Sequence, residues 1–93
     1  MRLRYERGAL ADLDALFAYI ARDNKEAASR TTNRIQEAVA RIAASPYIGK
    51  ETRKPQFRQF RVGHSLIVYE LNGDEITIFH VRHDARLRPW EGE

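Results

Sequence analysis

The stretch from residue 75 to residue 88 reads Glu75-Ile-Thr-Ile-Phe-His-Val-Arg-His-Asp-Ala-Arg-Leu-Arg88 and joins an apolar segment to a basic one. From Ile76 to Val81 the side chains are apolar or β-branched at both alternating positions, with His80 the main exception. A strand that faced water on one side would alternate apolar with polar residues, so this pattern predicts a central strand covered on both faces. The residues that follow would present charge at the rim of that strand; they are Arg82, His83, Asp84, Arg86 and Arg88.

The composition is that of one small domain, residues 1–93, because so short a chain cannot supply two separate cores. Cysteine is absent, which excludes disulfides and thiolate-bound metals. The first residues hold no apolar run long enough for a signal peptide, and no later segment is long enough to span a bilayer. We therefore expect a cytoplasmic protein that makes no membrane contact.

The net charge of +3 is modest, and the positions of the cations are more informative. Two basic clusters occur, one between residues 50 and 61 with Glu51 as its single acid, and one after Val81. Basic clusters attract anionic partners, although a solvated surface rich in arginine explains them equally well at this net charge. The cations of the first cluster are Lys50, Arg53, Lys54, Arg58 and Arg61.

Two helices are predicted between residues 9 and 45, where apolar residues recur every three or four positions. Gly8 is the candidate N-cap of the first helix. Asp23, followed three residues later by Glu26, resembles a capping box and marks the start of the second. Ser45-Pro46 ends it, because proline cannot continue a helix. A link this short makes the helices an antiparallel hairpin, and its expected core residues include Leu10, Leu13, Phe17 and Ile20.

Four strands are predicted around this hairpin. Residues 2–6 and 57–62 alternate apolar with polar side chains, whereas 65–71 and 76–81 are apolar on both sides. The resulting order is β-α-α-β-β-β, with residues 46–56 as a loop. We predict an α+β fold in which an antiparallel sheet carries the helical hairpin on one face, with the N-terminal strand joining the same sheet.

Asn72-Gly73 is the strongest hairpin signal in the chain and favours a type I′ turn. A two-residue turn at these positions would place Glu70 opposite Glu75, which is an unfavourable like-charge pair. A longer loop would avoid that pair, so the register of this hairpin stays open at this point.

Several segments occur together in an order and spacing that are typical of one protein family. They are Ala11 to Leu16 leading to Tyr19-Ile20-Ala21, Asn24 with Ala27-Ala28, Ile35 with Val39 and Ile42, Ser45-Pro46 with Gly49, Leu66 to Tyr69 after a glycine turn, and Ile76 to Val81 followed by His83 and Arg86. In these features the chain resembles the RelE/ParE superfamily of bacterial toxins from type II toxin–antitoxin systems. The long helical hairpin is closer to the ParE branch.

This resemblance implies a growth-inhibiting toxin that forms a hetero-oligomer with a cognate antitoxin encoded beside it. A ParE-like member would inhibit DNA gyrase, and a RelE-like member would cut mRNA on the ribosome. The sequence departs from the RelE pattern because no tyrosine follows Tyr69, and from the commonest ParE ending because Asp84 rather than glycine follows His83.

Ribonuclease chemistry of the RelE type would need cations to hold the phosphate and a group to transfer protons. Arg58, Arg61 and Arg82 could supply the cations, and His83 or His80 could transfer protons, because imidazole titrates near neutrality. Arginines at strand edges are more often simply solvated, and histidines within strands are more often packed or hydrogen-bonded. A metal site at His80, His83 and Asp84 is not expected, because residues three apart on a strand point to opposite faces.

The favoured interpretation is a ParE-like toxin that binds gyrase, is not an enzyme, and needs no cofactor or metal. The alternatives are a RelE-like endoribonuclease and a non-toxic binding module that kept the toxin fold. The candidate target-binding residues are Arg82, His83, Arg86 and Arg88. The candidate antitoxin-binding residues are Tyr19, Ile35 and Phe57.

Overall fold

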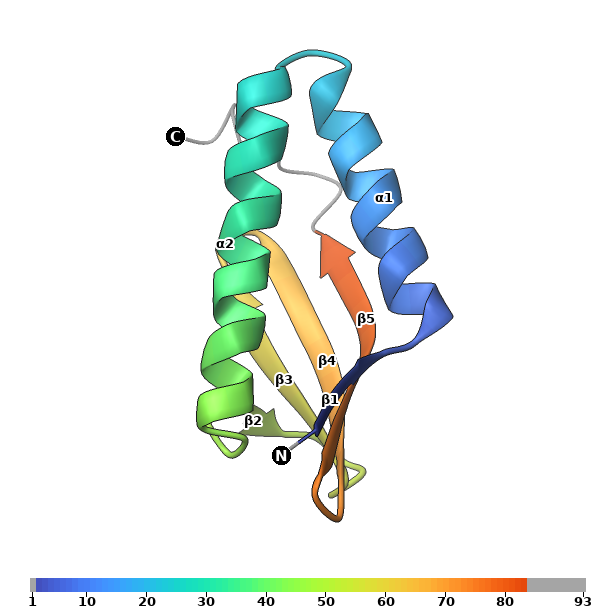
Figure 1. Ribbon diagram of the computed structural model, residues 1–93, viewed down its shortest axis with the longest axis vertical. Helices are drawn as coiled ribbons and strands as arrows, with labels where there is room; N and C mark the ends of the chain where they lie inside the picture. The colour runs from blue at the N-terminus through green and yellow to red at the C-terminus, as the bar shows by residue number, and fades with distance from the viewer. Residues whose placement is uncertain (1, 84–93) are drawn as a thin grey trace.

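The computed structural model describes residues 2–83, which form one sheet packed against two helices (Figure 1). The elements are β1 (Arg2–Tyr5), α1 (Arg7–Ala21), α2 (Lys25–Ala44), β2 (Lys50–Glu51), β3 (Phe57–Val62), β4 (Ser65–Asn72) and β5 (Glu75–His83). This order confirms the predicted α+β fold with its helical hairpin, and adds the short β2 within the expected loop. No helix in this part of the chain is long and apolar enough to cross a membrane.

The sheet has the strand order β1-β5-β4-β3-β2. Neighbouring strands from β2 to β5 pair antiparallel, as predicted for the last three strands. β1, in contrast, pairs parallel with β5, so the expectation of a wholly antiparallel sheet is wrong at this edge. A tight turn imposes antiparallel pairing on the two strands it joins. Nearly the whole chain separates β1 from β5, and no such turn sets the direction of β1.

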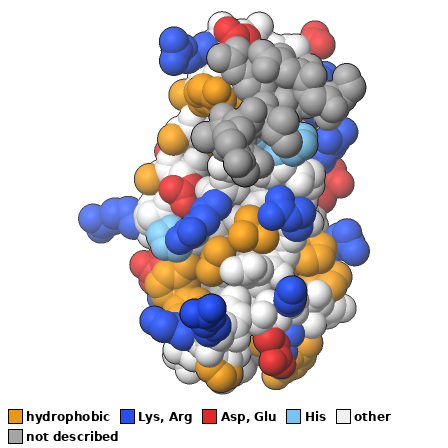
Figure 2. Space-filling model, turned by 180° about the vertical axis from the view of Figure 1, so that it is seen from behind, with side chains coloured by type: hydrophobic (Ala, Val, Ile, Leu, Met, Phe, Trp, Pro, Cys, Tyr) orange, Lys and Arg blue, Asp and Glu red, His pale blue; other side chains and the backbone are white. Residues whose placement is uncertain are grey.

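The two faces of the sheet differ in what covers them. Both helices pack against one face (Figure 1), and we call it the helix face. The opposite face, seen in Figure 2, has hydrophobic side chains near its centre with Lys and Arg side chains around them. Successive side chains of a strand alternate between faces, so buried Ile67 and Tyr69 of β4 belong to the helix face and Leu66 and Val68 to the other. We call the face that carries Leu66 and Val68 the open face.

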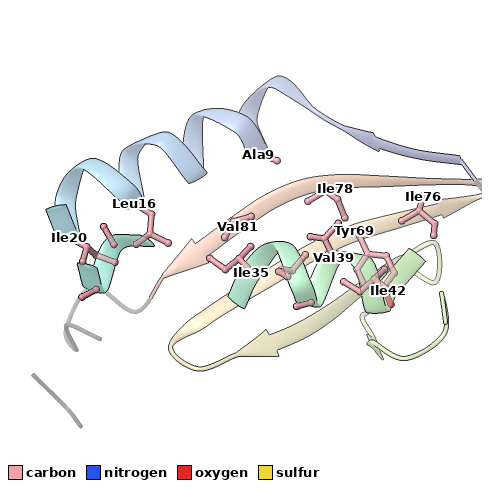
Figure 3. Packing of buried hydrophobic residues seen from close by; sticks show 14 residues of the cluster. Ala9, Leu16, Ile20, Ile35, Val39, Ile42, Tyr69, Ile76, Ile78 and Val81 are labelled. Carbon is pink, nitrogen blue, oxygen red and sulfur yellow. The ribbon is translucent and has the colours of Figure 1, made fainter. Parts of the chain in front are cut away.

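The hydrophobic core lies between the helix face and the hairpin (Figure 3). Ile20 of α1, Ile35 and Ile42 of α2, and Ile67 and Ile78 of the sheet are at most 1% exposed. Burial of one such side chain stabilises the fold by about 1.5–3 kcal/mol. Of the core predicted for the first helix, Ile20 is fully buried, and Leu13 and Phe17 are partly buried against the same cluster.

Leu10, which was expected in this core, is 49% exposed. Ala9, Leu16 and Ile20 define the buried stripe of α1. Leu10 follows Ala9 by one residue and so points about 100° away from it around a helix of 3.6 residues per turn. The helical period alone does not choose between neighbouring positions at the start of a helix.

Both helix N-caps differ from the predicted residues. α1 begins one residue before Gly8, with Glu6 as its N-cap, and the Glu6 side chain makes no capping hydrogen bond. α2 is capped by Asn24, whose Oδ1 accepts a hydrogen bond from the Ala27 backbone N–H at 3.0 Å, rather than by Asp23. Asparagine and aspartate cap equally well, so the sequence contained two suitable caps in succession. The end of α2 at Ala44, before Ser45-Pro46, is as predicted.

The hairpin between β4 and β5 turns at Gly73 and Asp74, one residue later than predicted. Gly73 has a φ of +62°, and no residue other than glycine has positive φ in residues 2–83. Positive φ at the first turn position alone is typical of type II′ rather than type I′. Glu75 consequently pairs with Asn72, and Glu70 pairs with Thr77, so the unfavourable Glu70–Glu75 pair does not form.

A β-bulge interrupts β5. Tyr69 of β4 pairs with Ile78, but the preceding Val68 pairs with His80, which leaves Phe79 as an extra residue. A bulge reverses the alternation of the side chains that follow it. Ile78 lies on the helix face before the bulge, and Val81 lies on the same face after it. The predicted two-sided burial holds for Ile76 to Ile78, whereas Phe79 is only partly buried and the His80 side chain is 49% exposed.

Candidate functional site

The bulge places the basic end of β5 on the open face. Leu66 pairs with Arg61 of β3 on one side and with Arg82 of β5 on the other. Paired residues share a face of the sheet, so Arg61 and Arg82 flank Leu66 on the open face. Both arginines are exposed. One arginine from each basic cluster of the sequence thus lies beside Leu66 of β4.

A groove of about 350 Å³ lies on this face. Within it the rings of Phe57 and Phe79 meet edge to face, with centroids 5.2 Å apart. Lys54 and Arg82 contribute exposed cations to its wall, and no acidic side chain within residues 2–83 lines it. The groove thus combines aromatic surface with positive charge, which attracts anionic partners. Its lining residues are Thr52, Lys54, Phe57, Gln59, Leu66, Val68, Phe79, His80 and Arg82.

His80 borders this groove and is also tied to α1. Its Nδ1 lies 3.5 Å from Oδ2 of Asp12. The same carboxylate oxygen accepts a hydrogen bond from the Val81 backbone N–H at 3.0 Å. β1 pairs with β5 only as far as Ile78, so beyond that residue Asp12 supplies the acceptor that a neighbouring strand would otherwise provide. Asp12 therefore anchors β5 just before Arg82.

Arg58, a candidate catalytic cation, supports a loop instead. It pairs with Tyr69 across β3 and β4 and so lies on the helix face. Its Nη1 donates to the Gly49 carbonyl oxygen at 2.7 Å and to that of Tyr47 at 3.3 Å. The guanidinium lies 4.9 Å from the centroid of the Tyr47 ring and 3.3 Å from a Glu51 carboxylate oxygen. With its side chain only 13% exposed, Arg58 holds the segment after α2 rather than facing a substrate.

Tyr69 secures the same segment from inside. Its hydroxyl donates to the Pro46 carbonyl oxygen at 2.7 Å and accepts from the Gly49 backbone N–H at 2.9 Å. Burial raises the pKa of this hydroxyl, against smaller opposing effects of the Gly49 hydrogen bond and the Arg58 charge. A Cβ added at Gly49 would lie 2.5 Å from the Tyr69 hydroxyl oxygen, so only glycine fits this close approach. We call the segment from Pro46 to Glu51, with Arg58 and Tyr69, the loop clamp.

His83 lies on the helix face, away from Arg82. It pairs with buried Ser65, and its Nδ1 is 3.1 Å from the Ser65 Oγ. The residues named for ribonuclease chemistry are thus divided, with Arg61, Arg82 and His80 on the open face and Arg58 and His83 on the helix face. The sheet separates the two groups.

The three candidate antitoxin residues also occupy different places. Tyr19 is 38% exposed and borders a groove of about 260 Å³ between α1 and the end of β5, together with Leu16 and Val81. Phe57 lies in the open-face groove. Ile35 is only 1% exposed within the core, so it is not a surface residue. Arg86 and Arg88, predicted to bind the target, lie outside the described residues.

Within residues 2–83 no cluster of three histidine, cysteine or acidic side chains could hold a metal ion. His80 and His83 point to opposite faces. His80 pairs with Val68 and lies on the open face, whereas His83 pairs with Ser65 and lies on the helix face. The arrangement offers charge and aromatic surface for binding a macromolecule.

A family model described as the ParE toxin of the type II toxin–antitoxin system parDE matches residues 3–88. The chain belongs to the ParE toxin family. This confirms the predicted superfamily and its ParE branch.

Individual relatives agree with this membership. The chain is 31% identical to Toxin ParE3 of Caulobacter vibrioides over 84 residues, which cover 87% of this chain and 83% of that protein. It is 33% identical to the putative toxin Y4kP of Sinorhizobium fredii over 90 residues, covering 95% and 93% of the two chains. Among solved structures it resembles a chain of the chromosomal ParDE toxin–antitoxin system from P. aeruginosa, with a TM-score of 0.74 at 26% identity over 89% of this chain and 95% of that one.

Sequence reasoning missed part of the surface that this ParE-family chain presents. Leu66, Val68 and Phe79 were expected to be buried, and instead they line the open-face groove. Apolar side chains occur both in cores and in binding grooves, so no feature of the sequence distinguished these two environments for the three residues. Asp12 was not among the site residues predicted from the sequence. Its partners on β5 are 68 and 69 residues away in the sequence and become visible only in the fold.

Replacing Asp12 by alanine is expected to destabilise the protein by about 1–2 kcal/mol, because the Val81 N–H loses a partly buried acceptor. Asp12→Asn should cost less, since its amide oxygen can still accept that hydrogen bond. Urea unfolding would measure both values. Native-state hydrogen exchange at Val81 should accelerate in Asp12→Ala and much less in Asp12→Asn. Equal protection of Val81 in the wild type and the alanine variant would contradict an anchoring role.

Proposed function

We propose that this ParE-family toxin acts in the cytoplasm by inhibiting DNA gyrase and that a cognate antitoxin neutralises it. Membership of the ParE toxin family supports a role as the toxin of a toxin–antitoxin system. The P. aeruginosa structure it resembles comes from a ParDE toxin–antitoxin system, which supports a protein antitoxin encoded beside this chain and a hetero-oligomer of the two.

One observation favours binding over catalysis. Ribonuclease action requires cations and a proton-transferring group around the same phosphate. Two members of the set predicted for that chemistry are removed from the open face, because His83 lies on the helix face and Arg58 is held in the loop clamp, which leaves Arg61, Arg82 and His80 there. An inhibitor that acts by binding needs no such convergence.

The target surface in this proposal is the open face. Arg61 and Arg82 flank Leu66, and the groove beside them exposes aromatic side chains. Aromatic residues and arginine are enriched at the energetic centres of protein–protein interfaces. A partly apolar groove bordered by cations suits an acidic surface of a protein target.

The antitoxin in this proposal covers the groove between α1 and β5. Tyr19 borders it with a partly exposed ring, and within residues 2–83 no strand pairs with this side of β5 beyond Ile78. An amphipathic or extended segment of the antitoxin could bury Tyr19 at this place. The antitoxin would contact Val81 and His83, the two neighbours of Arg82 in β5, and would neutralise the toxin by altering or shielding this strand end.

Pulse-labelling of growing bacteria after induction of this chain tests the proposal. We expect DNA synthesis to fall before protein synthesis and the cells to filament, with a parallel culture that carries the empty vector as control. Purified protein should then inhibit supercoiling by gyrase. A collapse of protein synthesis first would argue against gyrase as the target, and normal growth would favour the non-toxic binding module.

A RelE-like endoribonuclease is the second candidate, and the groove itself is what favours it. Aromatic side chains that stack bases beside cations that contact phosphates are typical of single-stranded RNA recognition. Phe57 and Phe79 lie in the groove with Lys54, Arg82 and His80. If protein synthesis fails first, His80→Ala is the variant to examine, because His80 is the imidazole on the same face as Arg82.

A further inference from the structure

A further pocket, which shares only His83 with the groove between α1 and β5, lies between α2 and the turn that joins β3 to β4. Its volume is about 80 Å³. A pocket for a drug-sized ligand measures roughly 300 Å³ or more, so this one admits only a small chemical group. Its lining comes from four parts of the fold: Thr31 and Arg34 of α2, Val62, Gly63 and His64 at the turn, Ser65 of β4, and His83 of β5.

Hydrogen-bond donors dominate this lining. Thr31 and Arg34 are three residues apart on α2 and therefore lie on the same side of the helix. Ser65 is 1% exposed, and its Oγ lies 3.1 Å from the Nδ1 of His83. The His64 ring is nearly perpendicular to that of His83, with centroids 6.4 Å apart. Hydroxyl, guanidinium and imidazole groups thus surround a small volume.

Among residues 2–83, Arg34 brings a permanent positive charge to this pocket, and no acidic side chain lines it. The neighbouring hollow between α2 and β3 is lined by Arg34 and Arg41 together with Glu37. A concave site lined by positive charge concentrates anions. An arginine guanidinium pairs well with phosphate because two parallel N–H groups match two oxygens.

We propose that this pocket, which we call the α2 pocket, binds a small tetrahedral oxyanion: phosphate or the phosphate group of a phosphomonoester. Arg34 makes the principal charged contact, and Thr31 and Ser65 offer hydroxyl groups from opposite sides. Ser65 and His83 lie on the helix face, so the α2 pocket is separate from the open-face groove where we place the target. The inference concerns a ligand of the toxin itself and does not depend on gyrase.

Histidine-selective NMR of the full-length chain, titrated with inorganic phosphate at constant ionic strength, tests the proposal. The His64 and His83 imidazole signals should shift saturably. Arg34→Ala should weaken binding about tenfold or more, because it removes a charge-assisted contact. Arg30→Ala is the matched control, since Arg30 is exposed on the same helix and lines no part of the pocket. Arg34 is also exposed, so its replacement should leave the fold intact.

Adenosine monophosphate in a second titration separates the two sources of the ligand. Tighter binding than phosphate identifies a nucleotide phosphate as the ligand, and weaker binding identifies the free anion. Either result supports the oxyanion site, provided that Arg34→Ala weakens it. The proposal is overturned if neither compound shifts the histidine signals beyond a chloride control. Equal weakening in Arg34→Ala and Arg30→Ala would also overturn it, because it would indicate only a general effect of charge.

Discussion

Replacing both Arg61 and Arg82 by glutamate is expected to abolish growth inhibition by this chain. The two arginines flank Leu66 on the open face, and both are exposed, so the fold should tolerate the change. Reversing two charges at an interface replaces attraction by repulsion, and like-charge contacts cost several kcal/mol. Colony counts after induction would measure toxicity, and binding of the purified variant to gyrase would locate the effect.

The matched control is Arg22→Glu with Arg30→Glu, which has the same net charge but changes two exposed positions of the helical hairpin, the C-cap of α1 and a residue of α2. This control should remain toxic. Circular dichroism must first show that both double variants are folded. Full toxicity of the Arg61→Glu, Arg82→Glu protein would refute the open face as the target surface, and loss of toxicity in both proteins would point to net charge alone.

Replacing Arg58 by alanine is expected to lower the free energy of unfolding by about 2–3 kcal/mol, because hydrogen bonds to charged groups contribute more than neutral ones. The Gly49 and Tyr47 carbonyl oxygens lose their donor, and the contact with the Tyr47 ring is lost. The Arg58 Nε is buried without a hydrogen-bond partner in residues 2–83. Burying this group costs free energy, so it offsets part of the stability that the other Arg58 contacts contribute. For a domain of this size such a loss lowers Tm by roughly 10 °C or more, measurable by thermal denaturation.

Arg53→Ala is a suitable comparison, because Arg53 is exposed in the neighbouring loop and should change Tm little. Toxicity gives the decisive contrast. At a temperature where Arg58→Ala stays folded, the loop-clamp role predicts retained toxicity, whereas a role in catalysis predicts its loss. An unchanged Tm together with lost toxicity would indicate that Arg58 acts directly in toxicity and does not serve the loop clamp.

Much of the fold could be predicted from residue patterns. The helical hairpin, the meander and the end of α2 at Ser45-Pro46 follow from period, glycine and proline, which act over a few residues. The errors occurred where two local solutions were nearly equal. Asn24 and Asp23 can both cap a helix, and a shift of the hairpin turn to Gly73 removed a like-charge pair. Such choices depend on small energy differences that a pattern does not express.

The candidate site was harder to predict from the sequence than the fold, although the residue types that form it were identified. Arg61, Arg82 and Phe57 were identified as candidates, but nothing local indicates that Arg58 is held by Gly49 while Arg61 is exposed. Both arginines belong to the same strand, and their difference arises from what packs beside each one. Contacts between residues distant in the chain decide which cations are free to meet a partner.

Local sequence is thus sufficient for the helices, most of the strands and the basic character of the β5 end. The tertiary structure decides which face that end presents. In a regular strand His80 and Arg82 would share the helix face with Ile76 and Ile78, because side chains alternate strictly. The bulge at Phe79 turns them to the open face and keeps Val81 in the core. Alternation is a local property, but the pairing of β5 with β4 is not, and that pairing sets the site.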